Sequence, residues 1–174
     1  MMQSQEYFKN KCVTATGYPL RREIVLATRQ TRQTALDKFN LSVERLTVLV
    51  VGGSRGARSI NRAALISGLD WIEAGAQVLH VTGQMDWRAV KKIHAQFAVE
   101  NRAHYHIFPY LSDAMGLALR AADLVVARAG ASCLGEFPAF GLPALLVPYP
   151  YGWRYQISNA ELLSDRGAAD WIED

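Results

Sequence analysis

A chain of 174 residues with 50% hydrophobic and 20% charged residues has the composition of a folded globular domain, which excludes a disordered or fibrous protein. The formal charge of +3 is a mild excess, and no run of Lys and Arg alternates with aromatic residues, so nucleic acid is not an expected partner. No apolar run approaches the roughly 20 residues that a membrane-spanning helix needs.

The first residues and the cysteines indicate the compartment. Residues 1–10 contain no apolar core of signal-peptide length, and Cys12 and Cys133 are far apart in dissimilar surroundings. Such cysteines favour a reducing, cytoplasmic location over a disulfide framework, and their spacing predicts no metal site. Basic residues gather at positions 21–32 and 55–62. They favour a solvated helix face, with attraction to phosphate or to an anionic membrane surface as the alternative.

Six short apolar runs alternate with amphipathic stretches. The runs lie at residues 46–51, 77–82, 105–110, 123–127, 144–147 and 168–172. Because they lack polar alternation, they are typical of strands buried on both faces of a sheet. The stretches between them have helical spacing, at residues 59–74, 86–99, 112–122, 132–140 and 156–165. This alternation predicts an α/β fold with a Rossmann-like, doubly wound parallel sheet of about six strands.

The segment before the first strand has no strand pattern. Residues 22–39 predict one polar helix, and residues 14–20 predict a loop. We therefore expect residues 1–44 to form a lead-in made of a linker and a helix, and residues 45–174 to form the compact Rossmann-like domain.

A glycine-rich turn, Gly52 to Arg58, follows the first predicted strand. In an open parallel sheet, ligands bind where the strands end, and glycines let backbone amides approach a phosphate. No Gly-Lys-Ser/Thr follows, so the turn is not a P-loop, and a simple tight turn explains it nearly as well. Short-chain dehydrogenases carry a similar turn followed by a Tyr-x-x-x-Lys pair. The only such pair here, Tyr7 and Lys11, precedes the turn, which disfavours hydride transfer.

A second candidate phosphate site follows the fourth predicted strand, at Ala131, Ser132 and Cys133. After the turn at Gly130, these residues would form the first turn of a helix, where amide groups are free to bind an anion. Glu136 lies one turn further on the same face, and its carboxylate can accept hydrogen bonds from a ribose diol. The structural alternative is that Ser132 is a simple N-cap and Glu136 a partner of the helix dipole.

After the fifth predicted strand, a loop rich in proline and aromatic residues leads into a helix that begins with Gln156. Gln156 and Asn159 are three residues apart and share one helix face. Amides both donate and accept hydrogen bonds, which suits sugar hydroxyls, although two surface residues at a helix start would show the same pattern.

Six stretches in this order resemble the nucleotide-sugar-binding half of MurG and related GT-B glycosyltransferases. They are residues 17–21, residues 52–58 with Asn61, Tyr110-Leu111 leading to Met115, residues 128–136, residues 141–144 and residues 156–160. The resemblance implies the C-terminal half of a GT-B fold with UDP-N-acetylglucosamine as the donor. It implies that the phosphates are bound by Arg21 and by Ala131, Ser132 and Cys133, and that Gly53, Ser54 and Arg55 lie near the phosphates and the sugar. Uracil would contact Tyr110 and Leu111, and the ribose would contact Glu136. The sugar hydroxyls would contact Gln156 and Asn159.

The resemblance also implies an inverting transfer of N-acetylglucosamine to lipid I, forming lipid II in peptidoglycan synthesis. In the family, a first domain binds this lipid-linked acceptor and is expected to supply the general base, and we find no counterpart of that domain here. No Asp-x-Asp motif of the metal-dependent transferases is present, so neither a metal nor another cofactor is expected. We expect this chain to bind the donor weakly and to be inactive alone, at the inner face of the cell membrane or free in the cytoplasm.

Three alternatives remain open at this point. The chain could belong to another GT-B glycolipid transferase with a different UDP-sugar. It could be a donor subunit that works with a separate acceptor-binding partner, in which case an exposed apolar patch around Tyr18, Leu20 and the C-terminal helix is expected. It could also be a non-catalytic nucleotide-binding module.

Overall fold

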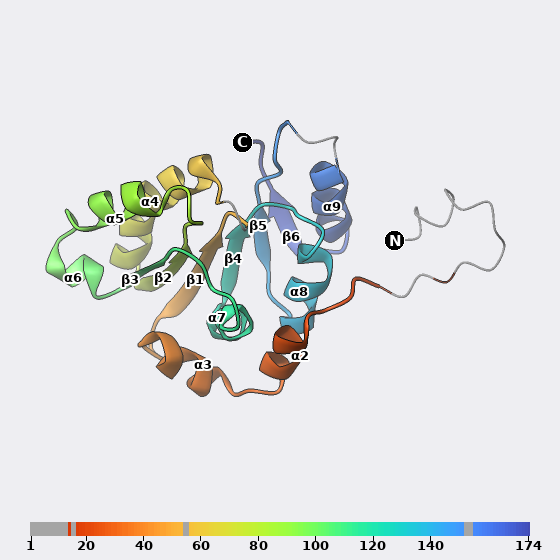
Figure 1. Ribbon diagram of the computed structural model, residues 1–174, viewed down its shortest axis with the longest axis horizontal. Coiled ribbons are helices and arrows are strands. Elements are labelled where there is room, and N and C mark those ends of the chain that lie inside the picture. The colour runs from red at the N-terminus through yellow and green to blue at the C-terminus, as the bar shows by residue number, and fades with distance from the viewer. Residues whose placement is uncertain (1–13, 15–16, 54–55, 152–154) are drawn as a thin grey trace.

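The computed structural model describes residues 14, 17–53, 56–151 and 155–174 (Figure 1). Its strands are β1 (Leu46–Val51), β2 (Ala76–Val81), β3 (Tyr105–Phe108), β4 (Leu124–Ala127), β5 (Ala144–Leu146) and β6 (Ala169–Trp171). The helices of the described residues are α2 (Arg22–Thr28), α3 (Arg32–Phe39), α4 (Arg58–Glu73), α5 (Trp87–His94), α6 (Val99–Arg102), α7 (Met115–Ala121), α8 (Cys133–Phe140) and α9 (Tyr155–Ser164).

The strands form one parallel sheet in the order β3-β2-β1-β4-β5-β6. Each lies within two residues of its predicted position, so the predicted α/β class and doubly wound parallel sheet are confirmed. Strand order reverses direction between β1 and β4, which pair in register from Val48↔Leu124 to Val51↔Ala127. In this class of fold, such a reversal marks the crevice where ligands bind.

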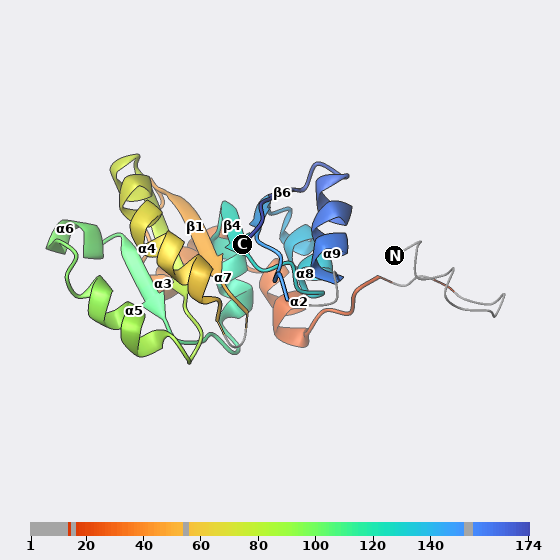
Figure 2. The same cartoon turned by 90° about the horizontal axis from the view of Figure 1, so that it is seen from above.

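Two layers of helices cover the sheet, one on each face (Figures 1 and 2). One face packs with α2, α3, α7, α8 and α9 around side chains such as Leu49, Val125 and Leu146, which are fully buried. The other face packs with α4 and α5 around Val50, Val78 and Ile60. Burying one such aliphatic side chain stabilises the fold by about 2 kcal/mol. The continuous apolar character of the strands therefore reflects burial on both faces.

The predicted single polar helix over residues 22–39 is wrong. The chain forms α2 and α3, which are separated by a break in which Thr31 has an extended backbone and its hydroxyl accepts the Thr34 amide at 3.1 Å. Neither helix is wholly polar, because Ile24 of α2 and Leu36 of α3 are fully buried. Each helix is only two turns long, so its apolar stripe consists of too few residues to stand out in the sequence.

An ion pair also fixes α3 to the sheet. The guanidinium of Arg32 donates to Asp123 at 2.6 Å, and the same carboxylate accepts the backbone amide of Thr47 at 2.8 Å. Asp123 precedes β4 and Thr47 lies in β1, so one carboxylate joins α3 to the two central strands. Residues of the expected lead-in thus share the core of the Rossmann-like domain.

The helical stretch predicted at residues 86–99 is shorter than expected, because α5 ends at His94 and α6 begins only at Val99. His94 is half-buried, and its Nε2–H donates to the carbonyl of Tyr105 at 2.8 Å. On the same face of the sheet, an apolar groove of about 300 Å³ runs between α4 and strands β4–β6, lined by Trp71, Leu145 and Ile172 among others. No helix of the described residues is long and apolar enough to cross a membrane.

A buried polar network crosses the α4 side of the sheet. His80 of β2 is fully buried, and its two ring nitrogens contact Asn61 Oδ1 at 2.9 Å and the Tyr105 hydroxyl at 3.0 Å. Asn61 in turn donates to the Thr82 carbonyl at 2.9 Å and to Asp86 at 3.0 Å. Every partner in this network is satisfied, so it fixes α4 relative to the end of β2.

We predict that His80 makes the fold sensitive to acid. Burial lowers the pKa of His80 to about 3, with a smaller contribution from His94. Because the folded pKa lies below the unfolded value of 6.5, stability is complete above that value and falls as the pH drops from 6.5 towards 3. This residue alone should lower the free energy of unfolding by up to about 1.4 kcal/mol for each pH unit in this range. Urea unfolding of His80→Gln and of the unmodified protein between pH 7 and 4.5 would show a shallower slope for the variant, and equal slopes would contradict the prediction.

Candidate functional site

The candidate site lies at the carboxyl edge of the sheet, where the loops after β1, β4 and β5 come together. Pairing of Val51 with Ala127 places the glycine-rich turn after β1 beside the segment that begins with Arg128. Pairing of Ala127 with Leu146 brings the loop after β5 next to both. The sheet register therefore gathers three of the predicted motifs, which are far apart in the sequence.

The turn after β1 depends on glycine. Gly53 has a φ of +88° and Gly56 a φ of +84°, both in the region that other residues rarely adopt, and the Gly56 amide donates to the Gly53 carbonyl at 3.0 Å. A Cβ on Gly56 would lie 2.3 Å from the Thr82 carbonyl oxygen. The turn thus rests directly on the end of β2. Ser54 and Arg55, predicted to contact the phosphates and sugar, lie outside the described residues.

Arg21 and Glu136, predicted to bind different parts of the donor, form an ion pair in the structure. The guanidinium Nη2 of Arg21 lies 3.3 Å from Glu136 Oε1, and only 12% of the Glu136 side chain is exposed. Gly135 lets the neighbouring segment lie close to α8, because a Cβ there would come within 3.0 Å of the Leu20 side chain and 3.1 Å of the Tyr18 side chain, which would have to shift slightly. The segment of residues 17–21 therefore lies against the start of α8, and Tyr18 of the expected apolar patch remains 38% exposed.

The start of α8 offers backbone amides to an anion. Within the described part of the chain, the amides of Ala131 and Ser132 have no hydrogen-bond acceptor, whereas the Cys133 amide donates to the Gly130 carbonyl at 3.0 Å. The Ser132 hydroxyl makes no capping bond there either, so the interpretation of Ser132 as a simple N-cap is not supported. Burial and the nearby Glu136 raise the pKa of the Cys133 thiol to about 12. Its side chain is thus an uncharged core group.

Gln156 and Asn159 lie on one face of α9 and hold two loops of the site. Gln156 Oε1 accepts the backbone amide of Tyr149 at 2.9 Å, and Asn159 Nδ2 donates to the carbonyl of Ala129 at 2.9 Å. Each bond uses one polar atom of the side-chain amide. Gln156 retains its NH₂ group and Asn159 retains its oxygen, which are a donor and an acceptor suited to sugar hydroxyls.

Tyr110 and Leu111 follow β3 at the same edge of the sheet. Tyr110 is 45% exposed, and the next residue, Leu111, is buried. An exposed ring beside a fixed backbone is the arrangement that can stack on a base and pair with its edge. The structure shows no contact that joins Tyr110 to Glu136 or to Gln156 among the described residues.

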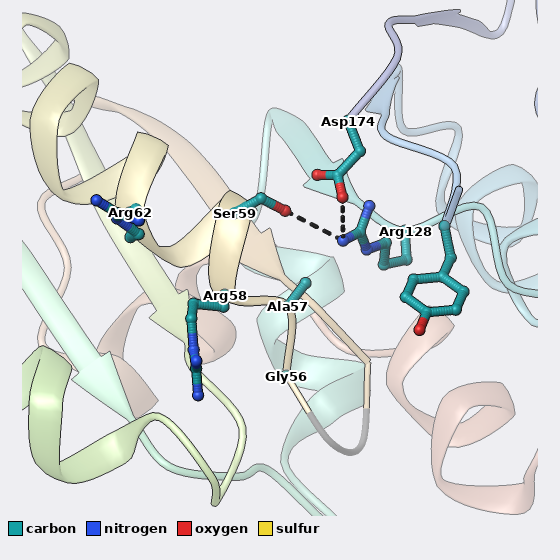
Figure 3. A pocket seen from close by; sticks show the side chains of 8 residues that line it. Gly56, Ala57, Arg58, Ser59, Arg62, Arg128 and Asp174 are labelled. Carbon is teal, nitrogen blue, oxygen red and sulfur yellow. Dashed lines mark hydrogen bonds and ion pairs between the residues drawn. The ribbon is translucent and has the colours of Figure 1, made fainter. Parts of the chain in front are cut away.

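Arg128, to which the sequence patterns assign no role, lines a cavity of about 360 Å³ (Figure 3). Its guanidinium donates to the carbonyls of Val147 at 3.1 Å and Pro148 at 3.2 Å. It also donates to Ser59 Oγ at 3.1 Å and to the Asp174 carboxylate at 3.0 Å. The only available signal was an arginine directly after a buried strand.

Arg128 and Asp174 form an ion pair in this cavity. Burial alone would raise the pKa of Asp174, but hydrogen bonds from Arg128 and Ser59 outweigh it and leave that pKa below its usual value. Arg58 and Arg62 from the start of α4 also line the cavity, and Arg58 lies 3.4 Å from Asp86. Within the described residues, no cluster of three or more His, Cys, Asp or Glu side chains could hold a metal ion.

Comparison with known proteins assigns the family. The family model described as the glycosyltransferase family 28 C-terminal domain matches residues 47–174. The chain belongs to this glycosyltransferase family. The predicted resemblance to the nucleotide-sugar half of a GT-B enzyme is thereby confirmed.

Curated relatives of this glycosyltransferase domain carry one name, UDP-N-acetylglucosamine--N-acetylmuramyl-(pentapeptide) pyrophosphoryl-undecaprenol N-acetylglucosamine transferase. The protein of Desulforamulus reducens is 43% identical over 176 residues, covering 98% of this chain and 46% of that protein. The protein of Roseiflexus sp. is also 43% identical, with 91% of this chain and 38% of that protein covered. The chain thus spans less than half the length of these relatives.

Solved structures agree on the fold. MurG of Acinetobacter baumannii superimposes with a TM-score of 0.68 at 25% identity, covering 99% of this chain and 49% of that one. ADP-heptose LPS heptosyltransferase II of E. coli reaches a TM-score of 0.59 at 16% identity, covering 94% of this chain and 46% of that one, and supports the fold alone.

We predict that Gly56→Ala destabilises the glycosyltransferase domain more than Gly75→Ala. Both glycines have positive φ, so each alanine incurs a conformational cost of about 1 kcal/mol. Only Gly56 would also push a Cβ into a neighbouring backbone oxygen, whereas nothing lies within 4 Å of a Cβ at Gly75. Urea unfolding should show a loss larger by about 1–3 kcal/mol at Gly56. Equal losses would mean that the turn can move away from β2 without cost.

Proposed function

We propose that this chain is the donor-binding domain of an inverting glycosyltransferase and that it binds UDP-N-acetylglucosamine. The observation that carries the proposal is the convergence of Arg21, Glu136 and the free amides at the start of α8 on one side of the carboxyl edge. A carboxylate suits a ribose diol, and a guanidinium beside a helix N-terminus suits a diphosphate. The name shared by the relatives supports N-acetylglucosamine as the sugar.

The proposed chemistry depends on stabilising the leaving group. An acceptor hydroxyl attacks C1 of the sugar, the bond from C1 to the diphosphate breaks, and UDP departs with the electron pair. The negative charge that develops on the diphosphate is stabilised by the Arg21 guanidinium and by the amides of Ala131 and Ser132. Before the donor binds, Arg21 is paired with Glu136, so binding exchanges this ion pair for contacts to the diphosphate and the ribose.

The proposal also covers the acceptor substrate of the transfer. The relatives are named for transfer to an undecaprenol-linked N-acetylmuramyl precursor, and they are more than twice as long as this chain. We infer that lipid I is the acceptor, that lipid II is the product in peptidoglycan synthesis, and that a separate domain binds the acceptor and supplies the base. The 174 residues alone are expected to bind the donor weakly without turnover.

We predict that calorimetric titration will detect UDP and UDP-N-acetylglucosamine binding to the purified chain, with UDP-glucose weaker and NADPH absent. Glu136→Gln should reduce UDP affinity by about tenfold, because a hydrogen bond to a charged carboxylate contributes about 1.5 kcal/mol. The same variant should also lose the preference of the protein for UDP over 2′-deoxy-UDP.

The matched control is Glu161→Gln, which removes the same charge from an exposed position on α9. Its UDP affinity should equal that of the unmodified protein. Binding of NADPH with no binding of UDP would overturn the proposal in favour of a dehydrogenase. UDP binding that Glu136→Gln leaves unchanged would show that the ribose lies elsewhere.

We further propose that the protein acts in the cytoplasm at the inner face of the cell membrane. The acceptor named for the relatives is attached to a membrane lipid. Helix α5, which lies beside α4 in both views (Figures 1 and 2), exposes Arg88, Lys91 and Lys92 and contains no acidic residue. Met85, just before it, is 74% exposed. A basic helix face next to an exposed apolar side chain fits an anionic lipid surface.

We predict that the chain sediments with vesicles that contain phosphatidylglycerol and not with pure phosphatidylcholine vesicles. Reversing two charges in Lys91→Glu/Lys92→Glu should abolish this binding, since each basic residue near an anionic surface contributes about 1 kcal/mol. The control Arg29→Glu/Lys38→Glu changes the net charge equally on α3 and the end of α2. If both double variants lost binding to the same extent, net charge and not the α5 surface would explain the attraction.

A further inference from the structure

Arg128 joins four segments that meet at the carboxyl edge of the sheet. It follows β4 and contacts Ser59 in α4, the carbonyls of Val147 and Pro148 after β5, and Asp174 beyond β6. Its guanidinium carbon also lies 5.5 Å from the ring centroid of Tyr149, a distance typical of a cation–π contact. Figure 3 shows the side chains of Ser59 and Asp174 directed towards the guanidinium.

The contacts of Arg128 restrict the loop after β5. Two carbonyls of consecutive residues accept from one guanidinium nitrogen, and the next side chain packs against the same group. Only 11% of the Arg128 side chain is exposed, so water competes little for these bonds. The planar donor geometry of arginine holds both the distance and the orientation of the loop backbone, which a lysine ammonium would not do.

The same loop holds Gln156. The backbone amide of Tyr149 donates to Gln156 Oε1, and this bond fixes which way the side-chain amide of Gln156 faces. Ala129, the residue after Arg128, orients the side-chain amide of Asn159 in a similar way, because the Ala129 carbonyl accepts a hydrogen bond from Asn159 Nδ2. Both amides at the start of α9 are therefore oriented by the segment of residues 128–129, one through the loop after β5 and one directly.

The contacts with Arg21 and Glu136 are separate from this arrangement. The Arg21–Glu136 pair lies at the start of α8, and among the described residues no hydrogen bond or ion pair connects it to the loop after β5. A displacement of that loop should therefore change the affinity of the site for a sugar bound next to α9. It should leave the affinity for a nucleoside diphosphate unchanged.

We propose that Arg128 is a positioning residue that sets the selectivity of the site for the sugar of a UDP-sugar over UDP alone. It acts by holding the loop after β5, which orients the side-chain amide of Gln156 towards the sugar hydroxyls. This proposal rests on the proposed function, since it assumes that the sugar lies against Gln156 and Asn159.

The test is the ratio of two affinities, for UDP-N-acetylglucosamine and for UDP, measured by calorimetry on the 174-residue chain. Arg128→Ala should weaken UDP-N-acetylglucosamine binding by about tenfold, a coupling of about 1.4 kcal/mol, while UDP binding changes less than twofold or so. Arg128→Lys keeps the charge and should show the same loss of the ratio, which makes the test independent of whether the alanine variant folds. Arg62→Ala, an exposed position in the same cavity, is the control and should leave both affinities unchanged.

A double-variant cycle separates positioning from a general loss of structure. If Arg128 acts through Gln156, then Arg128→Ala/Gln156→Ala should bind UDP-N-acetylglucosamine no more weakly than Gln156→Ala alone. Additive losses, or equal weakening of UDP and the UDP-sugar in the Arg128 variants, would overturn the proposal and leave the proposed function intact. If the unmodified chain bound neither ligand, the proposed function would fail for this chain and the role of Arg128 with it.

Discussion

The parallel pairing of β1 with β4 is the constraint on which the candidate site depends. Because the two strands run in the same direction and in register from Val48↔Leu124 to Val51↔Ala127, their following loops leave the sheet at the same edge. One loop is a glycine turn, and the other ends at Ala131 and Ser132, whose amides have no acceptor among the described residues. Antiparallel neighbours would place these loops at opposite edges, so the site exists only because helical crossovers separate the strands in the sequence.

Polar side chains hold this edge in place from both sides. On the α4 side, Asn61 and His80 join the helix to the end of β2, on which the glycine turn rests. Closer to the site, Arg128 joins the ends of β4 and β5 to α4. These groups are buried or nearly so, and a buried polar group without a partner costs about 1–3 kcal/mol. Their mutual satisfaction therefore favours one arrangement of the loops over slightly displaced ones.

The strands could be predicted closely from the sequence because burial on both faces leaves a continuous apolar run that has no other common explanation. The N-terminal helices could not, since α2 and α3 are each two turns long and their break at Thr31 depends on a local capping bond. At the site, the glycine turns and Glu136 were recognisable from their places after apolar runs. The pairing of Glu136 with Arg21 was not, because 115 residues separate them.

The sequence by itself determined the alternation of strand and helix, the positions where glycine is needed, and the residue types that can meet a phosphate, a ribose and a sugar. These properties are local, since they depend on periodicity and on the conformational freedom of single residues. Only the tertiary structure decided that Arg21 meets Glu136, that Arg128 holds the loop after β5, and that Gln156 is oriented by the Tyr149 amide. Such contacts follow from strand order and register, which are set by the packing of the whole sheet and by no short stretch of the chain.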